Sequence, residues 1–275
     1  MINKKLDSIF RQGSSTYYYS SIFFPHDIKE DVFILYAFVR QVDNLVDSIP
    51  QKTVELQQWR GDFDEAMANK PVANESVSLF ADLCRRRGFD KKWVDAFFRA
   101  MEADTKKTKY ATFAQLEAYM YGSAEVIGLM LANIIGLPIE SHPTARLMGK
   151  SMQYINFIRD IEEDNKLGRQ YIPQAFLARH QLNSLEHSNT KTHQANFTKL
   201  IEMEIKRYFE IKTEAAKGLK YLPKRCRIPV ATASQMYDWT AKQILIDPFI
   251  VYSKAVKPSK SKVLLTILYN TFLHL

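Results

Sequence analysis

The sequence predicts an all-α protein that forms one domain over residues 1–275. Only 9 Gly and 10 Pro occur in these 275 residues, and long stretches repeat apolar residues with the ~3.6-residue period of an amphipathic helix. Hydrophobic residues make up 46% of the chain, with 17 Phe and 14 Tyr. This composition suits a wide apolar interior, although it suits an ordinary large core equally well.

Charge and cysteine content narrow the class of protein. The formal net charge is +8 and the pI is about 9.2. This positive charge has four interpretations: it serves solubility alone, or it attracts an anionic substrate, an anionic membrane surface or nucleic acid. Two cysteines, Cys84 and Cys226, indicate no disulfide framework and favour a reducing compartment. The N-terminus has no apolar signal-peptide core, and the apolar run 263–269 is shorter than the ~20 residues that span a membrane. We therefore expect a cytoplasmic protein that touches a membrane at most peripherally.

In the N-terminal half, apolar periodicity and helix-breaking residues predict a series of helices. A short amphipathic segment and a polar-aromatic run, 14–21, come first. Pro25 and Pro50 bound the next helical pattern, because proline is disfavoured inside a helix. Gly88 is a typical helix C-cap. Helices are expected over residues 27–46, 53–69, 76–88 and 93–103.

The most apolar predicted helix covers residues 113–136. Ala124, Gly128, Ala132 and Gly136 recur every four residues along it, so one side of this helix is smooth. Small residues allow close approach, either by a neighbouring helix or by a flexible apolar chain. The sequence leaves both interpretations open.

The C-terminal half continues the helical pattern. Polar composition predicts a surface loop over 181–195, and Pro223 and Pro229 are expected to flank a basic turn. After the last of these helices the chain carries spaced lysines (Lys254, Lys257, Lys260 and Lys262) and an apolar end. Helices are expected over 144–167, 196–221 and 230–246, with a loop at 169–173.

Two predicted helices carry acidic groups on otherwise apolar faces. Arg40, Asp43 and Asp47 follow one another at i, i+3 and i+7, which places them on one face. Asn156, Asp160 and Asp164, at i, i+4 and i+8, repeat the arrangement. Like charges one turn apart repel unless a cation lies between them, so we expect the two acidic faces to look at each other.

Paired carboxylates serve as surface ion-pair partners, as glycosidase acid/base pairs or as ligands for Mg²⁺. Their position on apolar faces disfavours the first use. Two pairs, each with a neighbouring arginine (Arg40 and Arg159), favour the third, because arginine donates in a two-pronged geometry to phosphate oxygens. The sequence thus predicts carboxylate, Mg²⁺, diphosphate and arginine in one site.

Four segments of the chain resemble the squalene/phytoene synthase family, the head-to-head prenyl diphosphate synthases. They are Ser14-Ser15-Thr16-Tyr17 through Phe24-Pro25, the first aspartate motif at 40–47, the segment 119–128, and the second aspartate motif at 156–164, which continues through Gly168-Arg169-Gln-Tyr171-Ile-Pro173. Ser15 stands where lysine is common in the family. The order and separations of these segments match over nearly the whole chain.

The resemblance implies an isoprenoid-synthase helical bundle around a central apolar cavity. It implies that Asp43, Asp47, Asp160 and Asp164 bind Mg²⁺, with Mn²⁺ as a substitute. Tyr119, Tyr171, Arg40 and Arg159 would be catalytic. Residues implied in substrate binding are Ser14, Thr16, Tyr17, Arg40, Asn156 and Arg169.

The reaction that the resemblance implies joins two prenyl diphosphates. Loss of the first diphosphate gives an allylic cation, which alkylates the second substrate to a cyclopropylcarbinyl diphosphate. A second ionisation and rearrangement gives the hydrocarbon. The motifs are most similar to prokaryotic phytoene synthases, which favours two geranylgeranyl diphosphates as substrates. The alternative uses farnesyl diphosphate to give squalene or dehydrosqualene.

Two further positions depart from the family pattern: Glu125 replaces a small residue, and Asp238 stands where a basic residue is common, with Lys242 one turn later as a substitute. Neither NADPH nor nucleic acid is indicated as a ligand, and the sequence defines no oligomeric state. A non-catalytic helical membrane-binding protein would explain the basic tail and the aromatics. It would not require four aspartates at helical spacing in two places.

Overall fold

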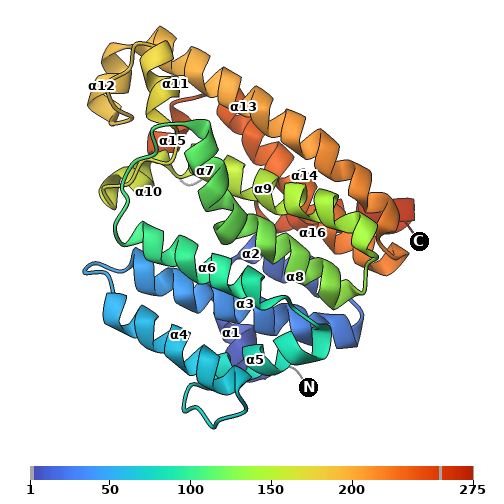
Figure 1. The fold of residues 1–275 in the computed structure, drawn as a ribbon. Coiled ribbons are helices and arrows are strands. Elements are labelled where there is room, and N and C mark those ends of the chain that lie inside the picture. Colours follow the sequence, from blue (N-terminus) through green and yellow to red (C-terminus); the bar gives the residue numbers. More distant parts are fainter. Residues whose placement is uncertain (1–2, 254–255, 275) are drawn as a thin grey trace.

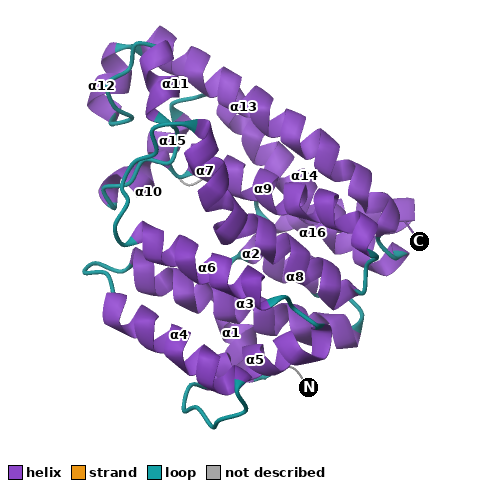
Figure 2. Ribbon diagram, in the orientation of Figure 1, coloured by secondary structure: helices purple, strands orange, loops and turns teal. Residues whose placement is uncertain are grey.

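The computed structural model describes residues 3–253 and 256–274, and helices dominate this range (Figure 1). Within it the only β-type pairing is one isolated bridge between Lys109 and Gln170, and Figure 2 shows loops as the only other element. The prediction of an all-α fold is confirmed.

The helices follow the apolar periodicity of the sequence, with breaks at prolines, glycines and polar turns. In the N-terminal half they are α1 (Lys4–Gly13), α2 (Ser15–Ser21), α3 (His26–Asp47), α4 (Thr53–Met67), α5 (Glu75–Arg87), α6 (Lys91–Asp104), α7 (Phe113–Met120) and α8 (Val126–Ile135). In the C-terminal half they are α9 (His142–Arg159), α10 (Ile161–Lys166), α11 (Gln174–Arg179), α12 (His187–Thr192), α13 (Gln194–Ala216), α14 (Lys224–Ile246), α15 (Ile250–Ser253) and α16 (Lys260–His274).

Helix α3 packs among α1, α4, α5 and α6 in the lower part of Figure 1. The core of this part is aromatic: the ring of Phe38 stacks on that of Phe80 with centroids 3.8 Å apart and also contacts Trp59, Phe63 and Phe98. These rings fill the space on the side of α3 that faces α4, α5 and α6. Much of the aromatic content therefore belongs to a solid core, which stiffens the helix that carries the first acidic face.

Helix α9 packs against α8, α13 and α14 in the upper part of Figure 1. Glycines permit the close approach of α8 and α9. A Cβ atom on Gly128 would lie 2.2 Å from the carbonyl oxygen of Ala145, and one on Gly149 would lie 2.3 Å from that of Ala124. The helix that carries the second acidic face is thus locked to α8 through its backbone.

The predicted helix 113–136 is one helical run with a π-helical segment, Tyr121–Glu125, between α7 and α8. Both interpretations of its small residues apply: Ala124, Gly128 and Ala132 line a cavity, and Gly128 also contacts the backbone of α9. Gly136 is different, because its φ of +75° makes it the left-handed cap of α8. It is not part of the smooth face.

Three predictions for the C-terminal half are wrong in detail. The helix 144–167 breaks at Asp160, between α9 and α10. The loop 181–195 contains α12, which buries Thr190 completely. The chain around Pro229 is no turn, because α14 starts at Lys224 and includes this proline. Burial against neighbouring helices outweighs the local preferences in the last two cases.

The apolar end of the chain forms α16, a helix that the sequence pattern did not define; Lys254 of the basic tail lies outside the described residues. One helical run, Phe113–Ile135, is long and apolar enough by length and composition to cross a membrane. More than half of it is buried in the protein, and it lines the cavity described next. We therefore interpret it as a core helix.

Candidate functional site

A cavity of about 730 Å³ lies between α3, α8, α9 and α14. Along α3 it runs from Val32 to Asp47, a distance of roughly 22 Å at 1.5 Å per residue. Many of its charged residues come from the C-terminal parts of α3, α6 and α9 and from the segment that follows α9, whereas many of its apolar residues come from the bodies of the helices. The polar group is Arg40, Asp43, Asp47, Asp104, Asn156, Arg159, Asp160, Asp164 and Arg169.

The first acidic face lies on the last turns of α3. Arg40, Asp43 and Asp47 all line the cavity, as their spacing predicts. Burial, reinforced by the neighbouring charge of Asp47, raises the pKa of Asp43 to about 7. The carboxylate of Asp47 accepts a hydrogen bond of 2.7 Å from Arg169. Among the described residues Arg40 makes no ion pair within 4.0 Å, so its guanidinium is available to an anion in the cavity.

The second acidic face follows the end of α9. Although Asp160 interrupts the helix, its backbone N–H still donates to the carbonyl of Asn156 at 2.8 Å, and that of Asp164 donates to Asp160 at 2.8 Å. The helical spacing therefore survives the break. Arg159 donates to both carboxylate oxygens of Asp160, at 2.6 and 2.5 Å. Burial, followed by repulsion from Asp160, raises the pKa of Asp164 well above its usual range.

The two acidic faces are electrostatically coupled in one place. Asp47 contributes to the raised pKa of Asp164, and the guanidinium of Arg169 opposes the same increase. Asp43 and Asp47 lie near the C-terminus of α3, where the macrodipole is negative, whereas Asp164 lies in the first turn of α10, where it is positive. The expectation that the two faces look at each other is confirmed.

The donor set of this region fits a hard divalent cation. Carboxylate oxygens are the ligands that Mg²⁺ and Mn²⁺ prefer, and Asp43, Asp47, Asp160 and Asp164 all line the cavity. Among the described residues no three acidic, imidazole or thiol groups form a ready cluster for a metal ion. In proteins Mg²⁺ usually takes one or two carboxylates and completes its shell with water and phosphate oxygens.

Asn156 supplies a further polar atom to the cavity. Its Oδ1 is buried and has no hydrogen-bond partner among the described residues, and Asn156 lines the cavity. A buried acceptor without a partner is costly, so a ligand or water that donates to this atom would relieve that cost. This observation agrees with the substrate-binding role that the sequence predicts.

The N-terminal segment also contributes residues to the cavity wall. Ser14, Thr16 and Tyr17 all line the cavity. However, the hydroxyl of Ser14 caps α2 by accepting from the backbone N–H of Tyr17 at 3.3 Å. The hydroxyl of Tyr17 donates to the sulfur of Met152 at 3.3 Å. A ligand would therefore have to compete with these two internal bonds.

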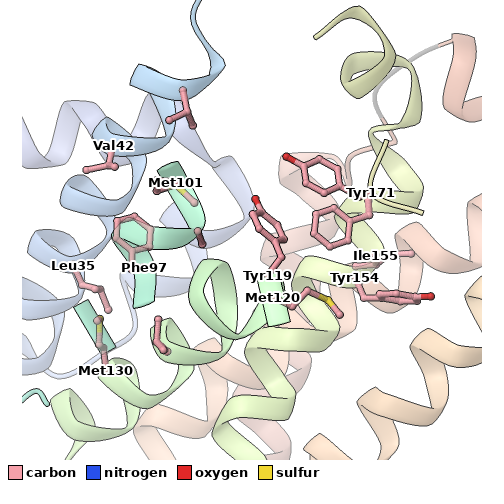
Figure 3. Packing of buried hydrophobic residues seen from close by; sticks show 14 of the residues in the cluster. Leu35, Val42, Phe97, Met101, Tyr119, Met120, Met130, Tyr154, Ile155 and Tyr171 are labelled. Atoms are coloured by element: carbon pink, nitrogen blue, oxygen red, sulfur yellow. The ribbon is translucent and has the colours of Figure 1, made fainter. Parts of the chain in front are cut away.

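Tyr119 and Tyr171 meet at an aspartate that sequence reasoning missed. Their ring centroids are 5.4 Å apart, and Figure 3 shows both rings within the buried cluster. Both hydroxyls donate to the carboxylate of Asp104, at 2.5 and 3.0 Å. Asp104 is the last residue of α6 and has no acidic partner at helical spacing. The one signal in the sequence that could have indicated a role for Asp104 is its position as a single aspartate at the end of a largely apolar helix.

The pH dependence of stability should reveal the burial of Asp104. Burial is the largest cause that raises its pKa to about 6, against about 3.9 in an unfolded chain. Between these pH values the folded state holds the Asp104 proton more tightly than the unfolded chain does. Protonation of Asp104 therefore stabilises the fold fully below pH ~4, and this stabilisation, roughly 3 kcal/mol, is lost as the pH rises through ~6. We expect Asp104→Asn to remove this component from the free energy of unfolding measured by denaturant titration.

The exposed Asp64 provides the control, because its side chain is 51% exposed and Asp64→Asn should keep the wild-type profile. An Asp104→Asn profile that coincides with the wild type over this range would show that Asp104 is not the titrating group.

The two departures from the family pattern are accommodated by ion pairs. Glu125 is buried and pairs with Arg146 at 2.8 Å and with Lys150 at 3.8 Å, both on α9. The Glu125 carboxylate therefore pairs with α9 and does not lie among the polar residues of the cavity. Asp238 accepts from Lys212 at 2.6 Å and from Tyr208 at 2.8 Å. Lys212, on α13, is thus its cationic partner.

A family model described as squalene/phytoene synthase matches residues 10–262 of this chain. The chloroplastic phytoene synthase of an Oncidium hybrid cultivar is 26% identical over 280 residues, which covers 97% of this chain and 68% of that protein. The 15-cis-phytoene synthase of Synechocystis sp. is 25% identical and covers 92% of this chain and 80% of its own length. The chain spans 61% to 68% of the first chloroplastic relatives that it matches.

Among solved structures, the fold is similar to that of a dehydrosqualene synthase in complex with ligand. The TM-score is 0.85 at 20% identity, with 98% of this chain and 95% of the other covered. The helical fold therefore has a counterpart of known structure.

Proposed function

Since the chain belongs to the squalene/phytoene synthase family, whose members are enzymes of the prenyltransferase type, we propose that it joins two geranylgeranyl diphosphates head to head to phytoene. The reaction would release two diphosphates and pass through a cyclopropylcarbinyl diphosphate. One observation carries this proposal: two acidic faces with their arginines line a cavity that also has many apolar residues in its wall. Such a cavity suits a ligand with a diphosphate head and a long hydrocarbon tail.

Asp43, Asp47, Asp160 and Asp164 would hold Mg²⁺ together with the diphosphate oxygens. When bound, the metal stabilises negative charge on the departing diphosphate. Burial is the main cause that raises the pKa values of Asp43 and Asp164, and loading the metal would offset the repulsion between neighbouring aspartates that adds to it. Mg²⁺ dependence is therefore part of the proposal, and Mn²⁺ is the expected substitute.

Three arginines would bind the diphosphates directly. Arg40 has no internal ion pair to break, whereas Arg159 and Arg169 are held by Asp160 and Asp47. These two tethers fix the direction of the guanidinium groups before a ligand enters. Fixed donors favour the transition state, because they need no reorganisation as charge develops on the leaving group.

Tyr119 and Tyr171 would stabilise the carbocations with their ring faces. Asp104 accepts a hydrogen bond from each hydroxyl, and the carboxylate thus sets the position of both rings. The smooth wall of Ala124, Gly128 and Ala132 leaves room for the prenyl tail. The apolar lining also excludes the water that would otherwise capture a cation.

The choice of the twenty-carbon substrate rests on the similarity to phytoene synthases. The alternative is that the chain joins two farnesyl diphosphates to squalene or dehydrosqualene, the activity named for the protein of similar fold. Both reactions use the same polar residues. They differ in how much of the apolar part of the cavity the tails fill.

Incubation with each prenyl diphosphate distinguishes the two reactions. We expect phytoene from geranylgeranyl diphosphate in the presence of Mg²⁺, and no dependence on NADPH. The hydrocarbon products are identified by chromatography and mass spectrometry, with a reaction containing a chelator as the control. Squalene or dehydrosqualene from farnesyl diphosphate, with geranylgeranyl diphosphate unreacted, would replace the first proposal with the second. Absence of any hydrocarbon from both substrates would refute both.

We also propose a cytoplasmic location with peripheral contact at the inner face of the membrane. A hydrocarbon product partitions into lipid, since transfer of apolar surface out of water is favourable. The net charge of +8 favours an anionic surface.

A further inference from the structure

Helix α16 is held against the protein in one fixed rotation. Its inner face buries Val263 and Ile267 against Ile228 and Met236 of α14. The buried side-chain amide of Asn270 donates to Thr232 Oγ1 and to Gln235 Oε1, both at 2.9 Å. These directional bonds prevent the helix from rolling about its axis. The side chains on its other face therefore point outward by construction.

The outward face of α16 is apolar without interruption. Between Val263 and Leu273 no residue carries a charge, and the exposed fraction of the outward apolar side chains ranges from 46% for Leu264 to 89% for Phe272. The solvent-facing positions of these turns are Leu264, Leu265, Leu268, Tyr269, Phe272 and Leu273. Elsewhere on the described chain, large exposed apolar residues occur singly, as at Val54 and Ile139, or in adjacent pairs, as at Ile22–Phe23 and Leu245–Ile246. A contiguous exposed patch of this kind marks an interaction site.

Positive charge adjoins this patch at one end. Lys260 and Lys262 lie in the first turn of α16, and Lys257 precedes it. Lysines in a first turn are unfavourable to the helix itself, because the macrodipole is positive there. An anionic surface would compensate for this cost. Apolar side chains next to lysines are the chemistry that binds the interface of an anionic lipid bilayer.

We propose that α16 docks the protein on an anionic lipid bilayer, with Leu264, Leu265, Leu268, Tyr269, Phe272 and Leu273 inserted into the interface. The helix has 15 residues and is shorter than the ~20 residues that span the hydrocarbon layer. It therefore lies in the plane of the membrane surface. The lysines bind the anionic headgroups, and their effect weakens as salt screens the surface.

The docked orientation brings the wall of the cavity next to lipid. Helix α14 packs on α16, and its residues Val230, Ala233 and Met236 also line the cavity. Lys257 and Pro258, which lead into α16, line it as well. If the proposed hydrocarbon product is correct, α14 and the docked α16 are the helices that lie between it and the bilayer. Docking itself does not depend on which product is made.

Co-sedimentation with lipid vesicles, in the absence of substrate, tests the docking surface. We expect binding to vesicles of phosphatidylcholine and phosphatidylglycerol in equal parts, and weaker binding to phosphatidylcholine alone. The double variant Leu268→Ser/Phe272→Ser should bind these vesicles at least about tenfold more weakly than the wild type. The matched variant Val54→Ser/Ile139→Ser, which also removes two exposed apolar side chains, should bind like the wild type.

A second pair of variants tests the charge. Lys260→Gln/Lys262→Gln should lose most of the preference for anionic vesicles, whereas Lys70→Gln/Lys191→Gln, at exposed lysines elsewhere, should retain it. All variants should keep the wild-type melting temperature, since the changed side chains lie outside the core. Equal binding by Leu268→Ser/Phe272→Ser and the wild type would overturn the proposal. So would absence of vesicle binding combined with dimerisation through α16 in sedimentation velocity runs.

Discussion

Asp43→Asn and Asp160→Asn should each abolish Mg²⁺-dependent release of diphosphate from prenyl diphosphates. Each change removes one anionic oxygen from a face that we propose as metal ligands. In Asp160→Asn the guanidinium of Arg159 also loses its charged partner. Loss of a single preorganised electrostatic contact to a transition state costs about 10²–10³ in rate. A colorimetric diphosphate assay, with Mg²⁺ varied from absent to saturating, measures the effect.

Both variants should remain folded, which separates a chemical effect from a structural one. Burial raises the pKa of Asp43 to about 7, so its charged form is unfavourable in the folded state, and Asp43→Asn should melt at the wild-type temperature or slightly above it. Asp64→Asn, at an exposed side chain, should keep full activity. Full activity of Asp43→Asn or Asp160→Asn would sink the metal assignment.

Gly128→Ala should destabilise the protein by about 3 kcal/mol or more. The added methyl group would lie 2.2 Å from the carbonyl oxygen of Ala145 and 2.9 Å from its carbonyl carbon. These are backbone atoms of α9 and cannot turn away as a flexible side chain would. Separation of α8 from α9 is the remaining response, and it would disturb the cavity wall as well as the packing. We expect the melting temperature to fall by roughly 6–12 °C.

Gly61→Ala is the matched control for this change. Gly61 lies inside α4, and a Cβ atom there would meet no atom within 4 Å. Alanine has the higher helix propensity, so this variant should gain roughly 0.5–1 kcal/mol. If Gly128→Ala melts at the wild-type temperature, the close approach of α8 and α9 is not a constraint on the fold.

Much of the helical fold could be read from local patterns. The helix that carries Arg40, Asp43 and Asp47 was placed within one residue of its observed start, because proline breaks and an apolar period are properties of consecutive residues. The predictions are wrong where contacts with distant parts of the chain determine the local structure. Pro229 is tolerated inside α14, and α12 forms because Thr190 finds a buried position. The burial of Pro229 and of Thr190 depends on helices that are distant in the sequence, so the residues next to them do not predict it.

The sequence by itself determined the two acidic faces of this protein. Their members share a face through helical spacing alone, and that spacing persists even across the break at Asp160. The tertiary structure decided that both faces meet at one cavity, that Asp104 joins Tyr119 to Tyr171, and that α16 presents an apolar face outward. The physical reason is range. Helical periodicity is fixed by local backbone geometry, whereas burial and long-range hydrogen bonds exist only after remote helices have packed.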